Sequence, residues 1–261
     1  MRRALLFLLL LTLTACGSAA PTPQKAGPVG RVVAPNFGDA DPHDWDGRDP
    51  LAYAVHGIDT SRWQGQVDWP TARANGVNFA FLKATEGGDI VDAAFAGNWR
   101  GARAAGVPVG AYHFWYHCRP AAEQARWFIR HVPRASGALP PVLDMEWTPF
   151  SPTCTKRPAP EVIRAEAKIF LDMVEAHYGQ RPIIYSAPDF FEANQMWKLG
   201  NYDFWLRSVA GHPRDTYGGQ HWTFWQYSGT GVVPGVRGKA DLNAFYGSAG
   251  DWAGWLAART R

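Results

Sequence analysis

The sequence predicts an α/β protein, a modified (β/α) TIM-like barrel whose later helices are short or missing. From residue 51 onward, short apolar runs alternate with amphipathic stretches, as in a parallel sheet with crossover helices. About eight apolar runs are present, and eight parallel strands close a barrel of this kind. Residues 51–261 are few for such a barrel, which usually needs roughly 250, so the later helices must be short.

The expected strands are short apolar segments bounded by turn residues. In chain order they occupy residues 54–59, 78–84, 107–115, 140–147, 181–186, 202–209, 221–228 and 240–242. Three expected helices have clear ends: residues 95–106 stop at Gly, residues 120–132 begin with Pro and carry an early Glu, and residues 160–179 begin with Pro-Glu and stop at Gly. A shorter helix is expected near residues 70–74. We expect neither an internal repeat nor a second domain.

The amino terminus has the organisation of a bacterial export signal. The first residues, MRR, are basic, and the apolar stretch after them is shorter than the roughly 20 residues that span a bilayer. It ends in LTAC (13–16), which resembles the lipobox of bacterial lipoproteins. We therefore expect a lipoprotein signal peptide at residues 1–15 and lipidation of Cys16. The alternative is an ordinary secretory signal that happens to contain Cys.

Residues 16–50 are rich in Pro, Ala, Gly and Asp and show no periodicity, so we expect a tether that continues into a lead-in segment. The barrel is then expected at residues 51–261. Acyl chains on Cys16 would hold it at a membrane surface without a transmembrane helix. The expected product is an exported, membrane-anchored lipoprotein that faces the periplasm or cell envelope as a monomer.

Composition argues against nucleic acid as a partner. The chain has 26 basic and 23 acidic residues, a net charge of +3, and no run of Lys or Arg. It also has 13 Trp, several of them near expected strand ends. A Trp at such a place either fills the core or presents its flat face to a ligand.

Besides Cys16, the chain contains Cys118 and Cys154. An exported protein folds in an oxidising compartment, where two remaining cysteines suggest one disulfide. The alternative is a Cys nucleophile with His113 or His117 as its base. The disulfide is the better interpretation, because a nucleophile leaves the other cysteine unexplained.

Four acidic residues are expected at one end of the barrel. Asp59 ends the first strand, Asp144 and Glu146 end the fourth, and Asp241 lies on the last. Closure makes the first and last strands neighbours, so Asp59 and Asp241 should lie side by side. Residues two apart in a strand face the same side, so Asp144 and Glu146 should both point into the barrel mouth, where such barrels place their chemistry.

Repulsion and partial burial raise the pKa of at least one carboxyl in such a group. A carboxyl that keeps its proton at neutral pH can protonate a glycosidic oxygen, while a second carboxylate stabilises the positive sugar ring. A metal site is another use of clustered acids. However, His113 and His117 are not expected on a helix, and no H-E-x-x-H occurs, so we expect neither a metal nor a cofactor. For Asp59 alone, a salt bridge or a helix cap would be the simpler interpretation.

Several segments resemble glycoside hydrolase family 25, the Chalaropsis-type lysozymes, and they occur in the family's order. The most characteristic is GIDTSRWQG (57–65), with the pattern D-x-S-x-x-Q-G. The others are VDW (67–69), FLKATEG (81–87), GAYHF (110–114), VLDMEW (142–147) with its D-x-E, PIIYS (182–186), FWL (204–206), WQYS (225–228) and ADLNAF (240–245). Each motif alone is weak evidence, but the ordered set is specific.

The resemblance implies hydrolysis of the β-1,4 bond between N-acetylmuramic acid and N-acetylglucosamine in the glycan strands of peptidoglycan. It assigns the acid/base role to Glu146, and carboxylate partner roles to Asp59, Asp144 and Asp241. It assigns sugar contacts to Tyr112, Tyr185, Trp205, Trp225 and Gln226. Lys83 and Glu86 also match, and we interpret them as structural. The chain departs from the family pattern after FWL, where Arg207, Ser208 and Val209 follow.

Two other functions fit parts of the sequence. A non-catalytic peptidoglycan-binding lipoprotein would need the aromatic side chains but not the four acids. A chitinase-like hydrolase also ends a strand in D-x-E, but the acidic run before its Glu is replaced here by Pro141, Val142 and Leu143.

Overall fold

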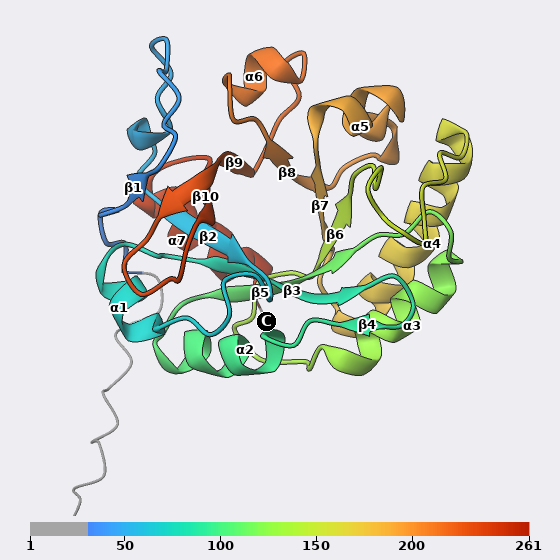
Figure 1. The fold of residues 1–261 in the computed structure, drawn as a ribbon, viewed down its shortest axis with the longest axis horizontal. Helices are drawn as coiled ribbons and strands as arrows, with labels where there is room; N and C mark the ends of the chain where they lie inside the picture. The colour runs from blue at the N-terminus through green and yellow to red at the C-terminus, as the bar shows by residue number, and fades with distance from the viewer. Residues whose placement is uncertain (1–30, 261) are drawn as a thin grey trace, which may run out of the picture.

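The computed structural model describes residues 31–260 as a barrel with helices around it (Figure 1). The expected signal peptide, Cys16 and the beginning of the expected tether lie outside the described residues. Among the helices in the described part, none is both long and apolar enough to cross a bilayer.

Eight strands within residues 31–260 close the barrel, in agreement with the expected TIM-like fold. Around the barrel they follow the order β2 (His56–Thr60), β3 (Ala80–Glu86), β5 (Val109–Phe114), β6 (Val142–Met145), β7 (Ile183–Ser186), β8 (Asp203–Arg207), β9 (Phe224–Val232) and β10 (Ala240–Phe245). Neighbours from β2 to β9 are parallel. β10 is antiparallel to both β9 and β2, so the barrel is mixed, which strand–helix alternation did not predict.

The antiparallel last strand explains how Asp241 reaches the other acids. Asp59 lies near the carboxyl end of β2, whereas Asp241 lies near the amino end of β10, and the two residues are direct partners across the ladder. Because β10 runs in the opposite direction, its amino end meets the carboxyl ends of the parallel strands. The expected proximity of Asp59 and Asp241 is confirmed.

The helices are α1 (Trp69–Ala74), α2 (Phe95–Ala104), α3 (Ala121–His131), α4 (Pro160–Tyr178), α5 (Pro188–Ala193), α6 (Pro213–Thr216) and α7 (Ala249–Arg259), with 3₁₀ turns η1 (Pro50–Ala52) and η2 (Met196–Leu199). Helices α2, α3 and α4 have 10 to 19 residues, whereas α1 and the helices between β7 and β9 have no more than six. The crossovers after β7 and β8 hold only short helices, and β9 connects directly to β10. The expectation of short or missing later helices is therefore confirmed.

Helix α7 closes the amino end of the barrel and was not predicted. Ser248 and Asp251 form a capping box at its start, in which each side chain bonds the other residue's backbone N–H. Trp252 is fully buried among lumen aromatics, including Phe79 and Phe245. The lumen is therefore filled at this end, and a cavity for a ligand can form only at the opposite end.

The barrel wall separates two apolar cores. One set of side chains fills the lumen: Val55, Phe79, Phe81, Tyr112, Leu139, Val142, Ile183, Tyr185, Trp205, Phe224, Phe245, Trp252 and Leu256. The residues between them along each strand, such as Ile58, Leu143 and Leu206, pack outward against the helices. Gly57 faces the lumen without a side chain, because a Cβ there would lie 2.4 Å from the carbonyl oxygen of Phe79.

The described part of the lead-in segment is packed onto the barrel. Strand β1 (Gly38–Asp39) pairs with the far end of β9, where Thr230 donates a hydrogen bond to the Asp39 carboxylate at 2.5 Å. Trp45 packs edge-on against Trp225 with ring centroids 5.1 Å apart. This part of residues 16–50 therefore extends the rim of the barrel beside β9.

Candidate active site

The end of β6 presents two acids to the barrel mouth. Along Val142–Met145 the side chains alternate, so Leu143 and Met145 lie in the outer core, while Asp144 faces inward. Glu146 follows two residues later and continues the inward face. Asp144 is only 6% exposed, whereas Glu146 is partly exposed, so Glu146 is the member of this pair that a ligand can reach.

Asp59 and Asp241 form a second pair of acids at the same end. Asp59 is 5% exposed, and burial together with the negative charge of Asp241 raises its pKa well above the ordinary value. Burial also raises the pKa of Asp241, while the hydrogen bond from Asp59 and the positive charge of Arg207 act in the other direction. Both carboxyls are therefore harder to ionise than a carboxyl in water, and Asp59 more so than Asp241.

Two amides fix the orientation of Asp59. Asn243 and Gln226 each donate a hydrogen bond to Asp59 Oδ1, at 2.8 and 3.0 Å. Gln226 in turn accepts a bond from the Tyr185 hydroxyl at 2.8 Å, and Asn243 accepts one from Trp205 Nε1 at 2.7 Å. Asn243 was not predicted. Its signal in the sequence was its position two residues after Asp241, on the same face of β10.

Asp144 lies beneath this mouth with one oxygen, Oδ1, that has no hydrogen-bond partner among the described residues. Burial raises its pKa well above the ordinary value, and the nearby charge of Glu146 adds to the shift. The Asp144 carboxyl is therefore harder to ionise than a carboxyl in water.

Glu146 has the pKa of a proton donor at neutral pH. Burial raises the pKa of its carboxyl to about 7, and the cations Arg207 and Lys83 oppose a larger rise. Lys83 also pairs with Glu86, with Nζ and Oε2 2.6 Å apart. Lys83, interpreted from the sequence as structural, therefore also contributes to the electrostatics of the site. Arg207, which marked the departure from the family pattern, does so too.

Four of the five predicted sugar contacts lie at the lumen face below or beside the acids. Tyr112 and Tyr185 line the lumen just below the acids, and each is slightly exposed. Trp205 lies deeper, 2% exposed and stacked on Phe81, so it supports the floor of the site. Gln226 faces inward and binds Asp59.

Trp225, the remaining predicted sugar contact, is not brought to the acids. Adjacent residues of a strand face opposite sides, so Trp225 points outward while Gln226 points inward. Its ring is fully buried between Trp45 and Trp222, and its Nε1 donates to the Ser208 carbonyl at 2.7 Å. Trp225 holds the lead-in segment against the barrel.

The predicted disulfide is present and lies behind the D-x-E segment. Cys118 and Cys154 are bonded, with Cα atoms 5.6 Å apart, which leaves neither thiol free to act as a nucleophile. The neighbouring His117 accepts a bond at Nδ1 from Trp115 Nε1 at 3.1 Å, so its proton is on Nε2. From there it donates to the backbone carbonyl of Glu146 at 3.3 Å.

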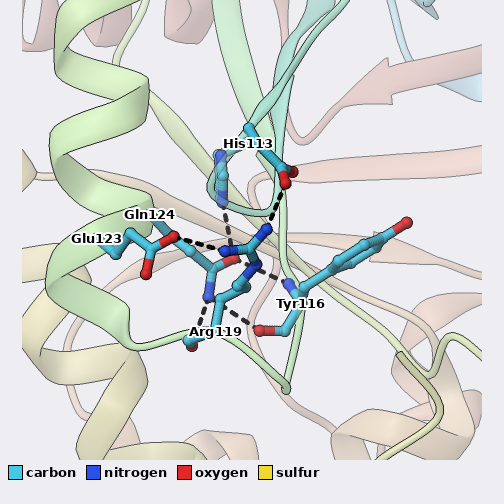
Figure 2. A network of polar contacts seen from close by, with 6 residues as sticks. His113, Tyr116, Arg119, Glu123 and Gln124 are labelled. Carbon is cyan, nitrogen blue, oxygen red and sulfur yellow. Dashed lines mark hydrogen bonds and ion pairs between the residues drawn. The ribbon is translucent and has the colours of Figure 1, made fainter. Parts of the chain in front are cut away.

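A second polar network joins the loop after β5 to helix α3 (Figure 2). Gln124 of α3 accepts from the Tyr116 backbone N–H at 2.9 Å and donates to the carbonyls of Tyr116 and Arg119. His113 is buried and bonded to Gln124 and Thr85, and burial lowers its pKa to about 4, so it is neutral. His113 therefore has a structural role.

The geometry supports acid/base chemistry at a sugar bond. Two pairs of acids meet at an open barrel mouth above two tyrosines, and one acid is both accessible and protonated near neutral pH. Within residues 31–260, no three His, Cys, Asp or Glu side chains are arranged to hold a metal ion. A barrel with paired acids of this kind at the carboxyl ends of its strands is typical of the glycoside hydrolases, both retaining and inverting.

Comparison with known proteins identifies the family. Residues 58–236 match the family model of glycosyl hydrolases family 25, and the chain belongs to this family. It is 38% identical over 214 residues to the protein YegX of Escherichia coli (strain CFT073), covering 80% of this chain and 76% of YegX. It is 34% identical over 210 residues to lysozyme M1 of Streptomyces globisporus, covering 75% of this chain and 69% of the lysozyme.

The structural comparison gives the same assignment. A family 25 glycosyl hydrolase from Bacillus anthracis superimposes with a TM-score of 0.71 and 33% sequence identity, over 83% of this chain and 98% of the other. The protein is therefore a lysozyme-type glycoside hydrolase.

Proposed function

We propose that this peptidoglycan hydrolase is an N-acetylmuramidase, which cleaves the β-1,4 bond between N-acetylmuramic acid and N-acetylglucosamine with Glu146 as the acid/base. The observation that carries the proposal is the combination of accessibility and a pKa of about 7 at Glu146. The names of relatives support it, since lysozyme M1 and two N,O-diacetylmuramidases are among the similar proteins.

In this mechanism Glu146 protonates the glycosidic oxygen as the bond breaks. The 2-acetamido group of the muramic acid attacks its own anomeric carbon, and Asp144 stabilises the positive charge that develops. Direct attack by a carboxylate is the alternative route to the same product. The raised pKa values of Asp59 and Asp241 keep the net charge of the mouth low.

The test is Glu146→Gln with analysis of the digestion products. We expect the rate on purified peptidoglycan to fall by roughly 10²–10⁴-fold or more. Glu161→Gln, at an exposed acid at the start of α4, is the matched control and should keep its rate. Mass spectrometry of wild-type products should show N-acetylmuramic acid at the new reducing ends. Clearing at the wild-type rate by Glu146→Gln would contradict the assignment, and cleavage of chitin oligosaccharides instead would support the chitinase-like alternative.

We also propose that the enzyme is anchored to a membrane through acyl chains on Cys16, which places it in the periplasm or cell envelope. The support is the LTAC sequence at residues 13–16 after a short apolar stretch. The mature chain isolated from bacteria should carry a mass increase of acyl groups at its first residue. Cys16→Ala should abolish that increase, and high salt should then release the protein from the membrane fraction.

A further inference from the structure

A basic groove lies on the face of the barrel remote from the acids. It consists of two adjoining hollows of about 720 and 320 Å³, which share Trp99, Val132, Pro133 and Arg134. Its floor contains Phe95 and Trp99 from α2, and its walls come from the end of α3 and the loop that follows. In Figure 1, α2 and α3 follow one another along the lower edge of the view.

The groove is lined by cationic side chains and by no acidic side chain of the described residues. Arg100, Arg130 and Arg134 line it and are exposed. His131 and His177 also line it, and the charge of Arg134 adds to the lowering of the His177 pKa that burial causes. Among residues 31–260, no acidic side chain lines either hollow, and none of these three arginines is in an ion pair.

The groove lies at the amino end of the parallel strands. The loop from Val132 to Leu139 leads into β6, and Gln180 precedes β7, so the smaller hollow faces the end opposite to Asp144 and Glu146. The described chain begins at this same end. The Arg31 carbonyl is bonded by Arg73, and Val33 exchanges two hydrogen bonds with Asn78, just before β3.

We propose that this basic groove docks the enzyme on an anionic phospholipid surface, with the active site turned away from that surface. The inference rests in part on the proposed anchor. Cys16 precedes Arg31 by 15 positions (31 − 16), a chain that reaches at most roughly 50 Å. The tether joins the barrel at its amino end, so an anchor on Cys16 keeps that end within reach of the membrane, where the arginines meet the lipid phosphates.

The remaining segment of this chain does not match the groove in charge. Residues 17–30 contain one Lys and no acidic residue, so they offer nothing for three arginines to bind. An anionic lipid leaflet offers phosphate groups that the arginines can bind, and each Arg near the leaflet increases the binding constant by roughly fivefold. Trp127, half-buried on α3 with the Arg130 guanidinium over its ring at 5.7 Å, adds an amphipathic side chain of the kind found at bilayer interfaces.

The test measures vesicle binding without the anchor. The chain from residue 16, with Cys16→Ser, is sedimented with vesicles of phosphatidylcholine alone, or of equal parts phosphatidylcholine and phosphatidylglycerol. We expect salt-sensitive binding to the anionic vesicles only. Arg100→Glu/Arg130→Glu/Arg134→Glu should weaken it by roughly 100-fold or more. The matched control is Lys156→Glu/Arg214→Glu/Arg237→Glu, which changes the charge equally at exposed positions of two loops and of the short helix α6 at the carboxyl end of the barrel and should bind like the wild type.

The outcomes separate this proposal from the proposed function. The groove variant should keep wild-type turnover of soluble peptidoglycan fragments, which shows that it folds. If it does not fold, the corresponding triple Gln variant replaces it. Equal binding to both vesicle types, or undiminished binding by the folded groove variant, would overturn the proposal. Binding of the protein to purified anionic wall polymer, without binding to either vesicle type, would also overturn the proposal. Loss of hydrolysis in Glu146→Gln leaves vesicle binding unaffected and bears only on the mechanism.

Discussion

Glu146 differs from Asp59 and Asp144 in its access to solvent, whereas Asp241 is partly exposed as Glu146 is. Asp59 and Asp144 are at most 6% exposed, so their protons cannot be handed to a polymer outside the barrel. Glu146 is partly exposed, and Arg207 and Lys83 offset part of the rise in pKa that burial causes. The two cations thus set the pH at which Glu146 is still protonated.

Replacing Arg207 should move the pH profile of the enzyme. Arg207 stabilises the ionised form of Glu146, so Arg207→Gln raises the pKa of the acid, and the basic limb of the kcat profile should shift from about pH 7 to higher pH. The measurement is kcat against pH on a soluble glycan fragment. Arg214→Gln, which removes an exposed cation of the short helix α6, should leave the midpoint in place. A shift to lower pH would contradict the charge assignment.

Which side chains reach the site was predictable where strand alternation was applied consistently. It placed Asp144 and Glu146 on one face, and the structure agrees. The same rule excludes Trp225 once Gln226 is placed inward, because adjacent residues face opposite sides. In the sequence, Arg207 stood out only as a departure from the family pattern. Its effect on the pKa of Glu146 could not be predicted, because it depends on how close the two side chains lie in the folded barrel.

At the scale of elements, the loops after β5 and β6 act as one unit. The Cys118–Cys154 bond joins them over a sequence separation of 36, and His117 bonds the carbonyl of Glu146. The ring of His117 is stacked on Phe190 of α5, with centroids 5.4 Å apart. The loop after β5 therefore holds the backbone of the proposed acid, and this loop is itself fixed by the disulfide to the loop after β6 and by the contact with α5.

Removing the disulfide should impair both stability and turnover. Cys118→Ser/Cys154→Ser frees a loop whose closure is worth roughly 3–4 kcal/mol, so the melting temperature should fall by roughly 10 °C. Turnover measured well below that temperature should fall by roughly tenfold, because the loop that holds the Glu146 backbone in place is no longer fixed. Leu171→Ala, in the buried face of α4, is the control that lowers stability without touching this unit. If both variants keep full kcat, the disulfide serves stability alone.

Element prediction succeeded where local signals were strong. Helix α4 begins at Pro160 and ends before Gly179, whose φ of 69° suits a residue without a side chain, and both signals are visible in the sequence. The direction of β10 was not predictable, because it follows from pairing with β2 at the other end of the chain. Helix α7 was missed although its capping box, Ser248 to Asp251, was available.

At the scale of the whole molecule, the acids at the mouth lower the stability of the fold. The pKa of Asp59 is raised by burial, so the folded state binds a proton more tightly than the unfolded chain does. The associated stability is fully present below the ordinary value of 3.8 and is lost as pH rises toward the folded pKa. At neutral pH the native fold therefore carries a cost that an uncharged residue would avoid.

Asp59→Asn should relieve that cost. The amide oxygen can still accept from Asn243 and Gln226, and the amide N–H can donate to Asp241. We expect the melting temperature to exceed that of the wild type at about pH 7 and the difference to vanish toward about pH 4. Thermal unfolding across this range tests it, with Asp44→Asn at an exposed acid as the control. A difference that grows toward acid pH would contradict the assigned shift.

The pairing of β2 with β10 has a consequence for when the enzyme becomes active. Asn243 binds Asp59 across 184 positions of the chain, so the ring of strands stays open until β10 has been synthesised. Before that point the nascent polypeptide lacks both Asp241 and Asn243, and Asp59 has no partner on β10. The producing cell therefore handles an inert chain until β10 joins β2.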